Sequence, residues 1–183
     1  MQKIGNFAAV FRIAHIMKIN FKGYRTWALV TGAASGMGRI YAQRLAEMGY
    51  NIVIVDINAE RLEETAGIVT ELVRDSSKVP QEAKTEFRLL QIVQDLSLTG
   101  AADAVFNWTE EAGCEVEVLV NNAGIMYCQA IHATSEKFLS LIMMVHMYTP
   151  LMLCRKYVNG MRDRKCGYIL NISSLASWMI WPG

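Results

Sequence analysis

The sequence predicts an α/β fold with a doubly wound parallel sheet, of which about five strands are present in the chain. Apolar runs alternate with helical patterns, and the runs are β-branched and continuous enough to be buried on both faces. Small or polar residues follow each run. With 183 residues, 52% of them apolar and 19% charged, the chain has the size and composition of a single well-buried domain.

The expected elements alternate along the whole chain after an N-terminal arm. Strands are expected at 27–31, 51–56, 87–93, 116–120 and 168–172. Helices are expected between them, from the glycine-rich loop to Gly49, then at 59–74, at 101–112 and at about 135–161, the last with a break near Pro150. Strands joined through helices require right-handed crossovers, so the sheet is expected to be parallel.

A glycine-rich loop follows the first expected strand, with the sequence Gly32-Ala-Ala-Ser-Gly36-Met-Gly38. Gly32 can turn the chain off the strand, Gly36 keeps the loop low beneath a ligand, and Gly38 lets the helix pack closely on the strand. Ser35 can donate to a phosphate or cap the helix. Backbone N–H groups at a helix N-terminus favour an anion, so a nucleotide pyrophosphate is the first ligand to consider. The structural alternative is an ordinary glycine-rich turn.

Asp56 stands at the end of the second expected strand. A carboxylate in this position can accept hydrogen bonds from an adenosine ribose, and its charge repels a 2′-phosphate. Neither Ser35 nor Ile57 is replaced by a basic residue. NAD is therefore favoured over NADP as the cofactor. The alternative is a carboxylate that serves only the N-terminus of the next helix.

Every expected strand ends in residues that suit a ligand site. These residues are Gly32–Gly38, Asp56, Asp95, Asn121–Gly124 and Ser173–Ser174. In parallel sheets ligands bind beyond the carboxyl ends of the strands, so we expect one site along this edge.

These motifs, in this order, resemble the short-chain dehydrogenase/reductase family over about residues 25–183. The resemblance implies a Rossmann-type fold and NAD(P)-dependent hydride transfer between a small-molecule alcohol and a ketone. It also implies that Asp95 contacts the adenine ring and that Asn121–Gly124 brace the central strands beside the ribose. The implied cofactor-binding residues are Gly32, Ser35, Gly36, Met37, Gly38, Asp56, Asp95, Leu96, Asn122, Ala123 and Gly124.

The family's catalytic set is Ser, Tyr and Lys, usually with an Asn. Ser174 matches the serine that polarises the substrate carbonyl, with a structural hydroxyl as the alternative. His146 lies where the family usually has the Asn that supports a proton-relay water; a neutral imidazole can hold that water, and a core histidine is the alternative.

The family's Tyr-x-x-x-Lys lies beyond the serine, whereas this chain ends at Gly183. We therefore expect the N-terminal, cofactor-binding part of a longer oxidoreductase, with the C-terminal strands and helices missing and no activity of its own. The alternative function is a catalytically inactive nucleotide-binding or interaction protein arising from truncation. A sugar-nucleotide epimerase fits the Asn-Asn-Ala-Gly motif less well.

Composition and the N-terminal segment indicate which other partners to expect: nucleic acid, metal, membrane or a second subunit. A net charge of +1 gives no reason to expect nucleic acid. Four cysteines without C-x-x-C pairing indicate reduced thiols in a cytoplasmic protein and no metal site. Residues 1–25 form an amphipathic arm, expected to pack on its own domain or on a second subunit, with a membrane surface bound through residues 1–22 as the alternative. The full-length form is expected to be a homo-oligomer.

Overall fold

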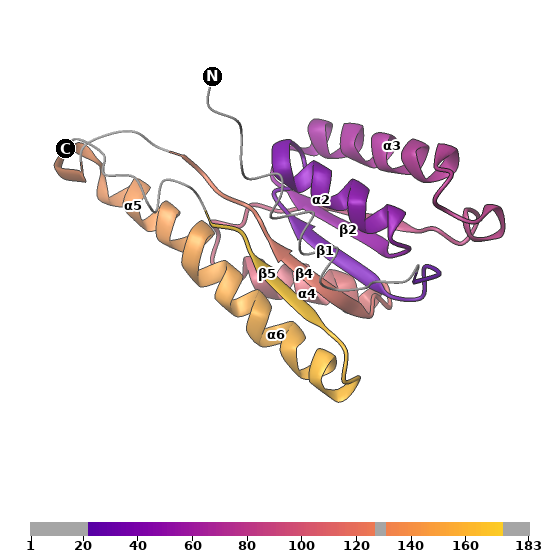
Figure 1. Cartoon of the computed structure of the whole chain (residues 1–183). Coiled ribbons are helices and arrows are strands. Elements are labelled where there is room, and N and C mark those ends of the chain that lie inside the picture. The colour runs from indigo at the N-terminus through magenta and orange to yellow at the C-terminus, as the bar shows by residue number, and fades with distance from the viewer. Residues whose placement is uncertain (1–21, 127–130, 174–183) are drawn as a thin grey trace, which may run out of the picture.

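The structure, a computed structural model, describes residues 22–126 and 131–173. Its centre is a five-stranded sheet in the order β3-β2-β1-β4-β5 (Figure 1). The strands are β1 (Trp27–Thr31), β2 (Asn51–Asp56), β3 (Leu89–Val93), β4 (Val116–Asn121) and β5 (Tyr168–Asn171). All neighbouring strands are parallel, which confirms the predicted doubly wound α/β fold.

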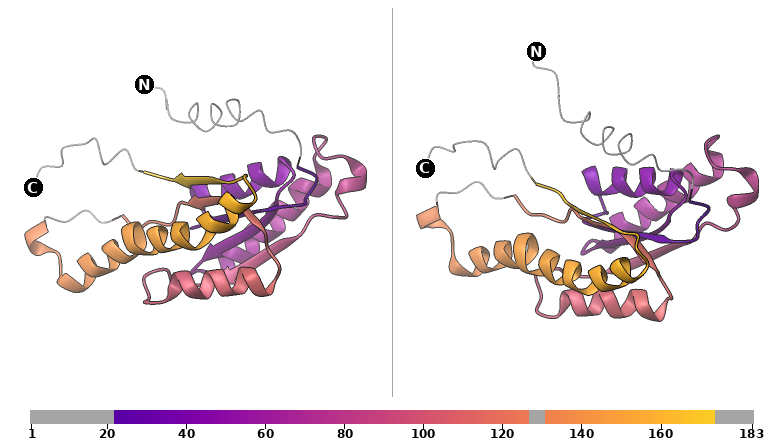
Figure 2. Two further views of the ribbon diagram at one scale, coloured as in Figure 1. Left: turned by 90° about the horizontal axis from the view of Figure 1, so that it is seen from below. Right: turned by 60° about the horizontal axis from the view of Figure 1, so that its bottom comes forward.

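Helices cover both faces of the sheet (Figure 2). They are α2 (Gly36–Glu47), α3 (Ala59–Asp75), α4 (Ala101–Glu111), α5 (Glu136–Met143) and α6 (Thr149–Asp163), with short 3-10 turns at Gln81–Ala83 and Ile131–Ala133. Helices α2 and α3 lie on one face, and α4 and α6 lie on the other. The chain moves outward from β1 to β2 and β3, and then returns to place β4 on the other side of β1.

Strand β1 shows how the sequence produces two cores. All five of its residues are buried. Because side chains alternate across a strand, Ala28 and Val30 enter the core under α2 and α3, while Trp27 and Leu29 enter the core under α4 and α6. A strand buried on both sides explains why the run is continuously apolar rather than alternating.

One long helix runs from Glu136 to Asp163, because a π turn at Met144–Tyr148 joins α5 to α6. The expected break near Pro150 is therefore wrong: Pro150 lies in the first turn of α6, where a missing N–H is tolerated, and the helix widens just before it. By length and composition this helix could cross a membrane. In the domain, however, its Leu153 and Tyr157 are buried in the core shared with α4.

The amino-terminal edge of the sheet holds a buried carboxylate. Glu117 on β4 is only 4% exposed. It accepts hydrogen bonds from Lys22 Nζ (2.7 Å), Thr26 Oγ1 (3.0 Å) and the Tyr50 hydroxyl (3.1 Å). Burial raises the pKa of Glu117, but hydrogen bonds from Lys22, Cys166 and Thr26 outweigh it, so the pKa lies below its ordinary value of 4.5.

Lys22 falls within the segment 1–25 that the sequence assigns to an N-terminal arm. In the structure it belongs to the domain, since its backbone N–H also donates to Met48 O at 2.9 Å. The rest of the arm, residues 1–21, lies outside the described residues.

Candidate functional site

The first and third glycines of the loop allow three segments to meet. Gly32 has a φ of +66°, and a Cβ there would lie 2.7 Å from Ala123 Cα. A Cβ on Gly38 would overlap Gly32 O and lie 2.6 Å from Asn122 Nδ2. The loop, the start of α2 and the end of β4 thus come together only because these side chains are missing. This agrees with the packing role expected for Gly38.

The middle of the loop is open. Gly36 has a φ of +54°, and a Cβ there would meet nothing within 4 Å. Ser35, Gly36 and Met37 are exposed, and Ser35 begins α2 without a side-chain capping bond. Within the described residues, the backbone N–H groups of Ser35 through Gly38 donate to no other atom. A helix N-terminus with free donors and open space above it fits an anion such as a pyrophosphate.

This loop lies at the point where the order of the sheet reverses. It follows β1, and Asn121–Gly124 follow β4, the strand that lies beside β1 on the side away from β2. Ligands in doubly wound sheets bind at such a reversal, beyond the carboxyl ends of the strands.

Asp56 lies beside the loop at the end of β2 and is partly exposed. Its Oδ2 accepts a hydrogen bond from Ala34 N (3.1 Å), and its Oδ1 accepts one from Asn58 N (3.0 Å). These bonds fix the carboxylate, and each oxygen keeps a second lone pair for a ligand. The N-cap of α3 is Asn58, whose side chain accepts from Arg61 N at 2.9 Å, and the bond from Asn58 N to Asp56 Oδ1 means that Asp56 also contacts the start of this helix.

Asn122 joins the ends of β1 and β4. Its Nδ2 donates to Thr31 O (3.1 Å) and Gly32 O (3.2 Å). Thr31 Oγ1 in turn accepts from the backbone N–H groups of Asn122 (3.0 Å) and Ala123 (3.1 Å). The bracing of the central strands that the resemblance implied is thus present. Thr31, at the end of an apolar strand, is an equal partner that the sequence did not single out.

Asp95 and Leu96 follow β3 on the same edge. Asp95 Oδ1 accepts from Ser97 N (2.8 Å) and Ser97 Oγ (2.7 Å), which fixes the turn. Leu96 is buried, and its carbonyl accepts from Thr149 Oγ1 at 2.8 Å. Leu96 therefore anchors the turn to the start of α6, while Asp95 remains partly exposed.

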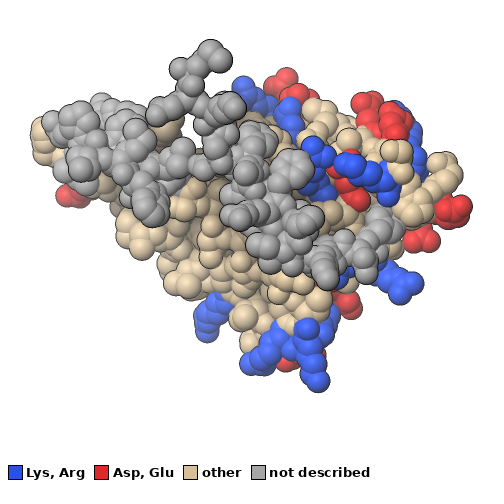
Figure 3. Space-filling model, in the orientation of Figure 1, with Lys and Arg blue, Asp and Glu red and all other residues tan. Residues whose placement is uncertain are grey.

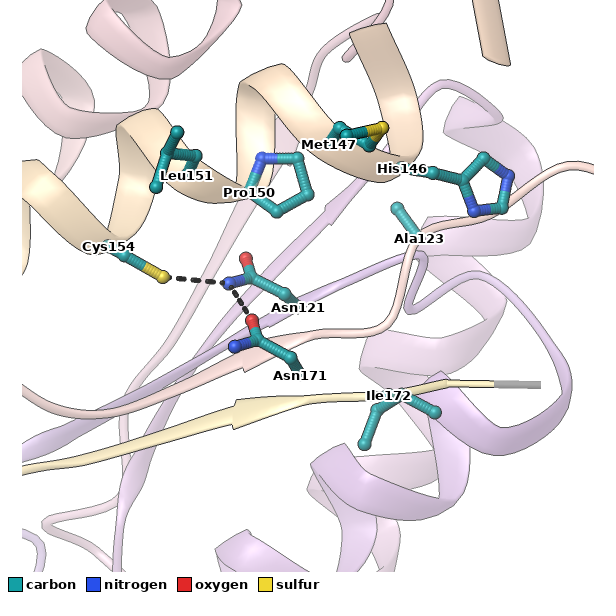
Figure 4. Close-up of a pocket in the computed structure, with 9 residues that line it drawn as sticks. All are labelled: Asn121, Ala123, His146, Met147, Pro150, Leu151, Cys154, Asn171 and Ile172. Carbon is teal, nitrogen blue, oxygen red and sulfur yellow. Dashed lines mark hydrogen bonds between the residues drawn. The ribbon is translucent and has the colours of Figure 1, made fainter. Parts of the chain in front are cut away.

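His146 projects from the π turn toward the segment after β4 (Figure 4). Its Nε2 lies 3.0 Å from both the N and the O of Ile125. A Cβ on Gly124 would lie 3.0 Å from His146 Cε1. The ring is exposed to solvent but packed against the chain at Gly124 and Ile125, so it is not a core histidine.

A cavity of about 240 Å³ lies between the end of β4, the end of β5 and the long helix. Asn121, Cys154 and Asn171 meet in its wall: Asn121 Nδ2 donates to Asn171 Oδ1 (2.9 Å) and to Cys154 Sγ (3.3 Å). Burial raises the pKa of the Cys154 thiol. Asn121 Oδ1 is buried and has no hydrogen-bond partner among the described residues, and Figure 4 shows it directed toward the helix near Pro150.

The structure therefore brings most of the predicted residues to one edge of the sheet. Ser174, the predicted carbonyl-polarising residue, lies outside the described residues; Ser173 before it is exposed just after β5. Two residues that contact the loop, Arg39 and Thr65, had no motif to mark them.

The family model for short chain dehydrogenases matches residues 26–183. The chain belongs to the short-chain dehydrogenase family. It is 32% identical over 164 residues to a very-long-chain 3-oxoacyl-CoA reductase-like protein of Arabidopsis thaliana, covering 87% of this chain and 47% of that protein. It is 35% identical over 153 residues to a (2S)-[(R)-hydroxy(phenyl)methyl]succinyl-CoA dehydrogenase subunit of Thauera aromatica, covering 83% of this chain and 56% of that one.

Among solved structures, L-sorbose reductase from Gluconobacter frateurii in complex with NADPH and L-sorbose matches with a TM-score of 0.75 and 27% identity. The match covers 90% of this chain and 58% of that one. The chain spans about half the length of the curated relatives that it matches.

Proposed function

We propose that this protein is a nicotinamide dinucleotide-dependent oxidoreductase acting between an alcohol and a ketone, and that the described residues form its cofactor-binding part. The observation that carries the proposal is the row of backbone N–H groups at Ser35–Gly38, which have no partner among the described residues and lie at the reversal point of the sheet, with Ser35, Gly36 and Met37 exposed. Membership of the short-chain dehydrogenase family supports it independently.

The residues present fit a dinucleotide. The N–H groups of the loop would hold the pyrophosphate at the N-terminus of α2. Asp56 would accept from the adenosine ribose, and the turn at Asp95 would lie beside the adenine. Asn122 would keep the ends of β1 and β4 together beneath the second ribose. The bound nicotinamide supplies the hydride exchange with the substrate carbon.

NAD rather than NADP is the proposed cofactor, although the matched L-sorbose reductase was solved with NADPH. Asp56 supports NAD, because its carboxylate is fixed by two backbone N–H groups where a 2′-phosphate would bring further negative charge. Basic residues that neutralise such a phosphate are missing at Ser35 and Ile57.

Calorimetric titration of the chain with NADH and with NADPH tests both statements. We expect saturable NADH binding and at least tenfold weaker NADPH binding, because one unpaired buried charge or one lost charged hydrogen bond is worth about 1.5–3 kcal/mol. In Asp56→Ala the NADH/NADPH preference should fall toward unity. An unchanged preference would reject the role of Asp56, and no binding of either would reject the cofactor.

Ser174 and His146 are proposed for the chemical step, Ser174 to polarise the carbonyl and His146 to hold a water in a proton relay. The fixed position of the His146 ring supports the second role. Substitution of His146 by Asn tests it: a relay role predicts turnover with a pH profile different from that of the parent, and identical profiles would dismiss it.

We also propose that the protein assembles as a homo-oligomer. The long helix carries five apolar side chains that are each at least 45% exposed, namely Met143, Met147, Tyr148, Leu151 and Val158, of which Met147 and Leu151 line the cavity. Figure 3 shows mostly uncharged surface over the middle of this helix, with Lys and Arg gathered toward its C-terminal end. Sedimentation of Met143→Glu against the parent tests this surface, because Met143 is exposed and does not line the cavity; an assembly of unchanged size would contradict the proposal.

A further inference from the structure

Two side chains hold the carbonyl groups of the glycine-rich loop from behind. Thr65 on α3 is fully buried, and its Oγ1 donates to Ala33 O at 3.1 Å. Arg39 on α2 donates from Nη2 to Ala34 O at 2.8 Å and from Nε to Thr65 Oγ1 at 2.9 Å. The two side chains therefore act together, since Arg39 binds both the loop and the residue that binds the loop.

The planarity of the peptide bond carries this effect to the open side of the loop. In a trans peptide the carbonyl and the following N–H point in opposite directions. Thr65, by binding Ala33 O, directs the Ala34 N–H away from α3, where it donates to Asp56 Oδ2. Arg39, by binding Ala34 O, directs the Ser35 N–H away from itself in the same way.

The Ala34–Ser35 peptide separates backbone groups that have hydrogen-bond partners from backbone N–H groups that have none among the described residues. Both backbone polar groups of Ala33 and Ala34 are paired: Ala33 N with Val55 O, Ala34 N with Asp56, and the two carbonyls with Thr65 and Arg39. From Ser35 to Gly38, the N–H groups have no partner within the described part of the chain, and the N–H of Arg39 is the next to be paired, with Ser35 O.

We propose that Arg39 and Thr65 are positioning residues, which fix the loop with its carbonyls turned inward and the Ser35 N–H turned toward the pyrophosphate. This inference rests on the proposed function for its ligand, and it adds two residues that touch no part of that ligand. A carbonyl turned outward would repel an anion, so the orientation of the Ala34–Ser35 peptide decides whether the loop attracts or repels it. The ion pair of Arg39 with Glu64 contributes little, since Glu64 is 56% exposed.

The test compares two pairs of variants. Thr65→Val keeps the shape of the side chain and removes its hydroxyl, while Thr65→Ser keeps the hydroxyl. Arg39→Met removes the guanidinium, and Arg44→Met makes the same change on the same helix at a half-exposed residue whose guanidinium hydrogen-bonds to Glu47 and not to the loop within the described residues. Amide hydrogen exchange of the unliganded chain and NADH affinity are measured on all four.

We expect faster exchange confined to the loop peptide in Thr65→Val and Arg39→Met, and NADH binding about tenfold weaker than in the parent. Thr65→Ser and Arg44→Met should match the parent in both measurements. Loss of general stability would instead raise exchange throughout the sheet.

Three outcomes separate the claims. If the parent binds NADH and all four variants bind it equally, the positioning role is wrong while the cofactor stands. If exchange in the loop is the same in all variants, the positioning role is also wrong. If the parent itself does not bind NADH, both the proposed function and the pyrophosphate role of the loop are overturned.

Discussion

At the amino-terminal edge of the sheet, Glu117 is buried and accepts from side chains that include Lys22, Thr26 and Tyr50, whereas at the carboxyl-terminal edge Asp56 accepts from two backbone N–H groups and stays partly exposed. The backbone donors at Ser35–Gly38, beside Asp56, have no partner in the part of the chain that the structure describes. Polar groups that are saturated inside the protein stabilise it, and those left with unused capacity are available to a ligand. The two edges are thus expected to respond differently to substitution.

The largest effect is expected at the amino-terminal edge. Glu117→Gln leaves Lys22 without its anion inside the domain, so it should lower the free energy of unfolding by about 3 kcal/mol at neutral pH. Urea unfolding measures this loss. NADH affinity of the folded variant should not change, because Glu117 lies at the opposite edge from the loop. Weaker NADH binding by the folded variant would break the separation between the two edges.

The same carboxylate predicts a pH dependence. The pKa of Glu117 is lower in the folded chain than its ordinary value of 4.5. Its contribution to stability is therefore complete above pH 4.5 and is lost as the pH falls through the folded pKa. The stability difference between the parent and Glu117→Gln should shrink in that acid window. A difference that stays constant down to the lowest pH at which the parent is folded would contradict this account.

A smaller loss of stability is expected from Gly38→Ala at the carboxyl-terminal edge. The new Cβ would overlap Gly32 O, and we expect a loss of about 2 kcal/mol together with loss of NADH binding. Gly67→Ala on α3 is the matched control, because its Cβ would meet nothing within 4 Å. That change should raise stability by about 0.5–1 kcal/mol. Thermal unfolding measures both changes. Equal shifts of the unfolding temperature in Gly38→Ala and Gly67→Ala would show that the loop is not closely packed.

The smallest effects distinguish two helix caps. Asn58 caps α3 by accepting from Arg61 N, so Asn58→Ala should cost about 1 kcal/mol. Ser35 caps α2 with no side-chain bond, and Ser35→Ala should change stability by less than about 0.5 kcal/mol. Its effect should appear in NADH affinity instead. Thermal unfolding and NADH titration of the two variants measure this difference. A larger loss of stability in Ser35→Ala than in Asn58→Ala would contradict it.

Much of the fold could be predicted because its signals are local. Continuous β-branched runs such as 51–56 and the glycine-rich loop gave strand and helix positions close to the observed ones. The π turn at Met144–Tyr148 could not be predicted, because it changes backbone hydrogen bonding without a change in the apolar pattern. Pro150 indicated an irregularity, but the helix continues through it.

The site was predicted only where a motif marks it. Gly38, Asp56 and Asn122 were found because turns and strand ends favour few residue types. Thr65 was missed because its partner lies on another element and nothing in its neighbourhood sets it apart from an ordinary helical threonine. Glu117 was missed for the same reason: its partner Lys22 is far away in the sequence and comes close only through folding.

The central claim is that the open loop at 32–38 holds the pyrophosphate of a nicotinamide dinucleotide. Fluorescence titration with NADH, repeated in the presence of ADP-ribose, measures this most directly, with cooperative unfolding as evidence that the chain is folded. The account predicts one saturable site for NADH, displaced by ADP-ribose and weakened by Gly36→Ala, whose methyl group would enter the open space above the loop. A folded chain with no saturable NADH binding, or with binding that ADP-ribose does not displace, would contradict it.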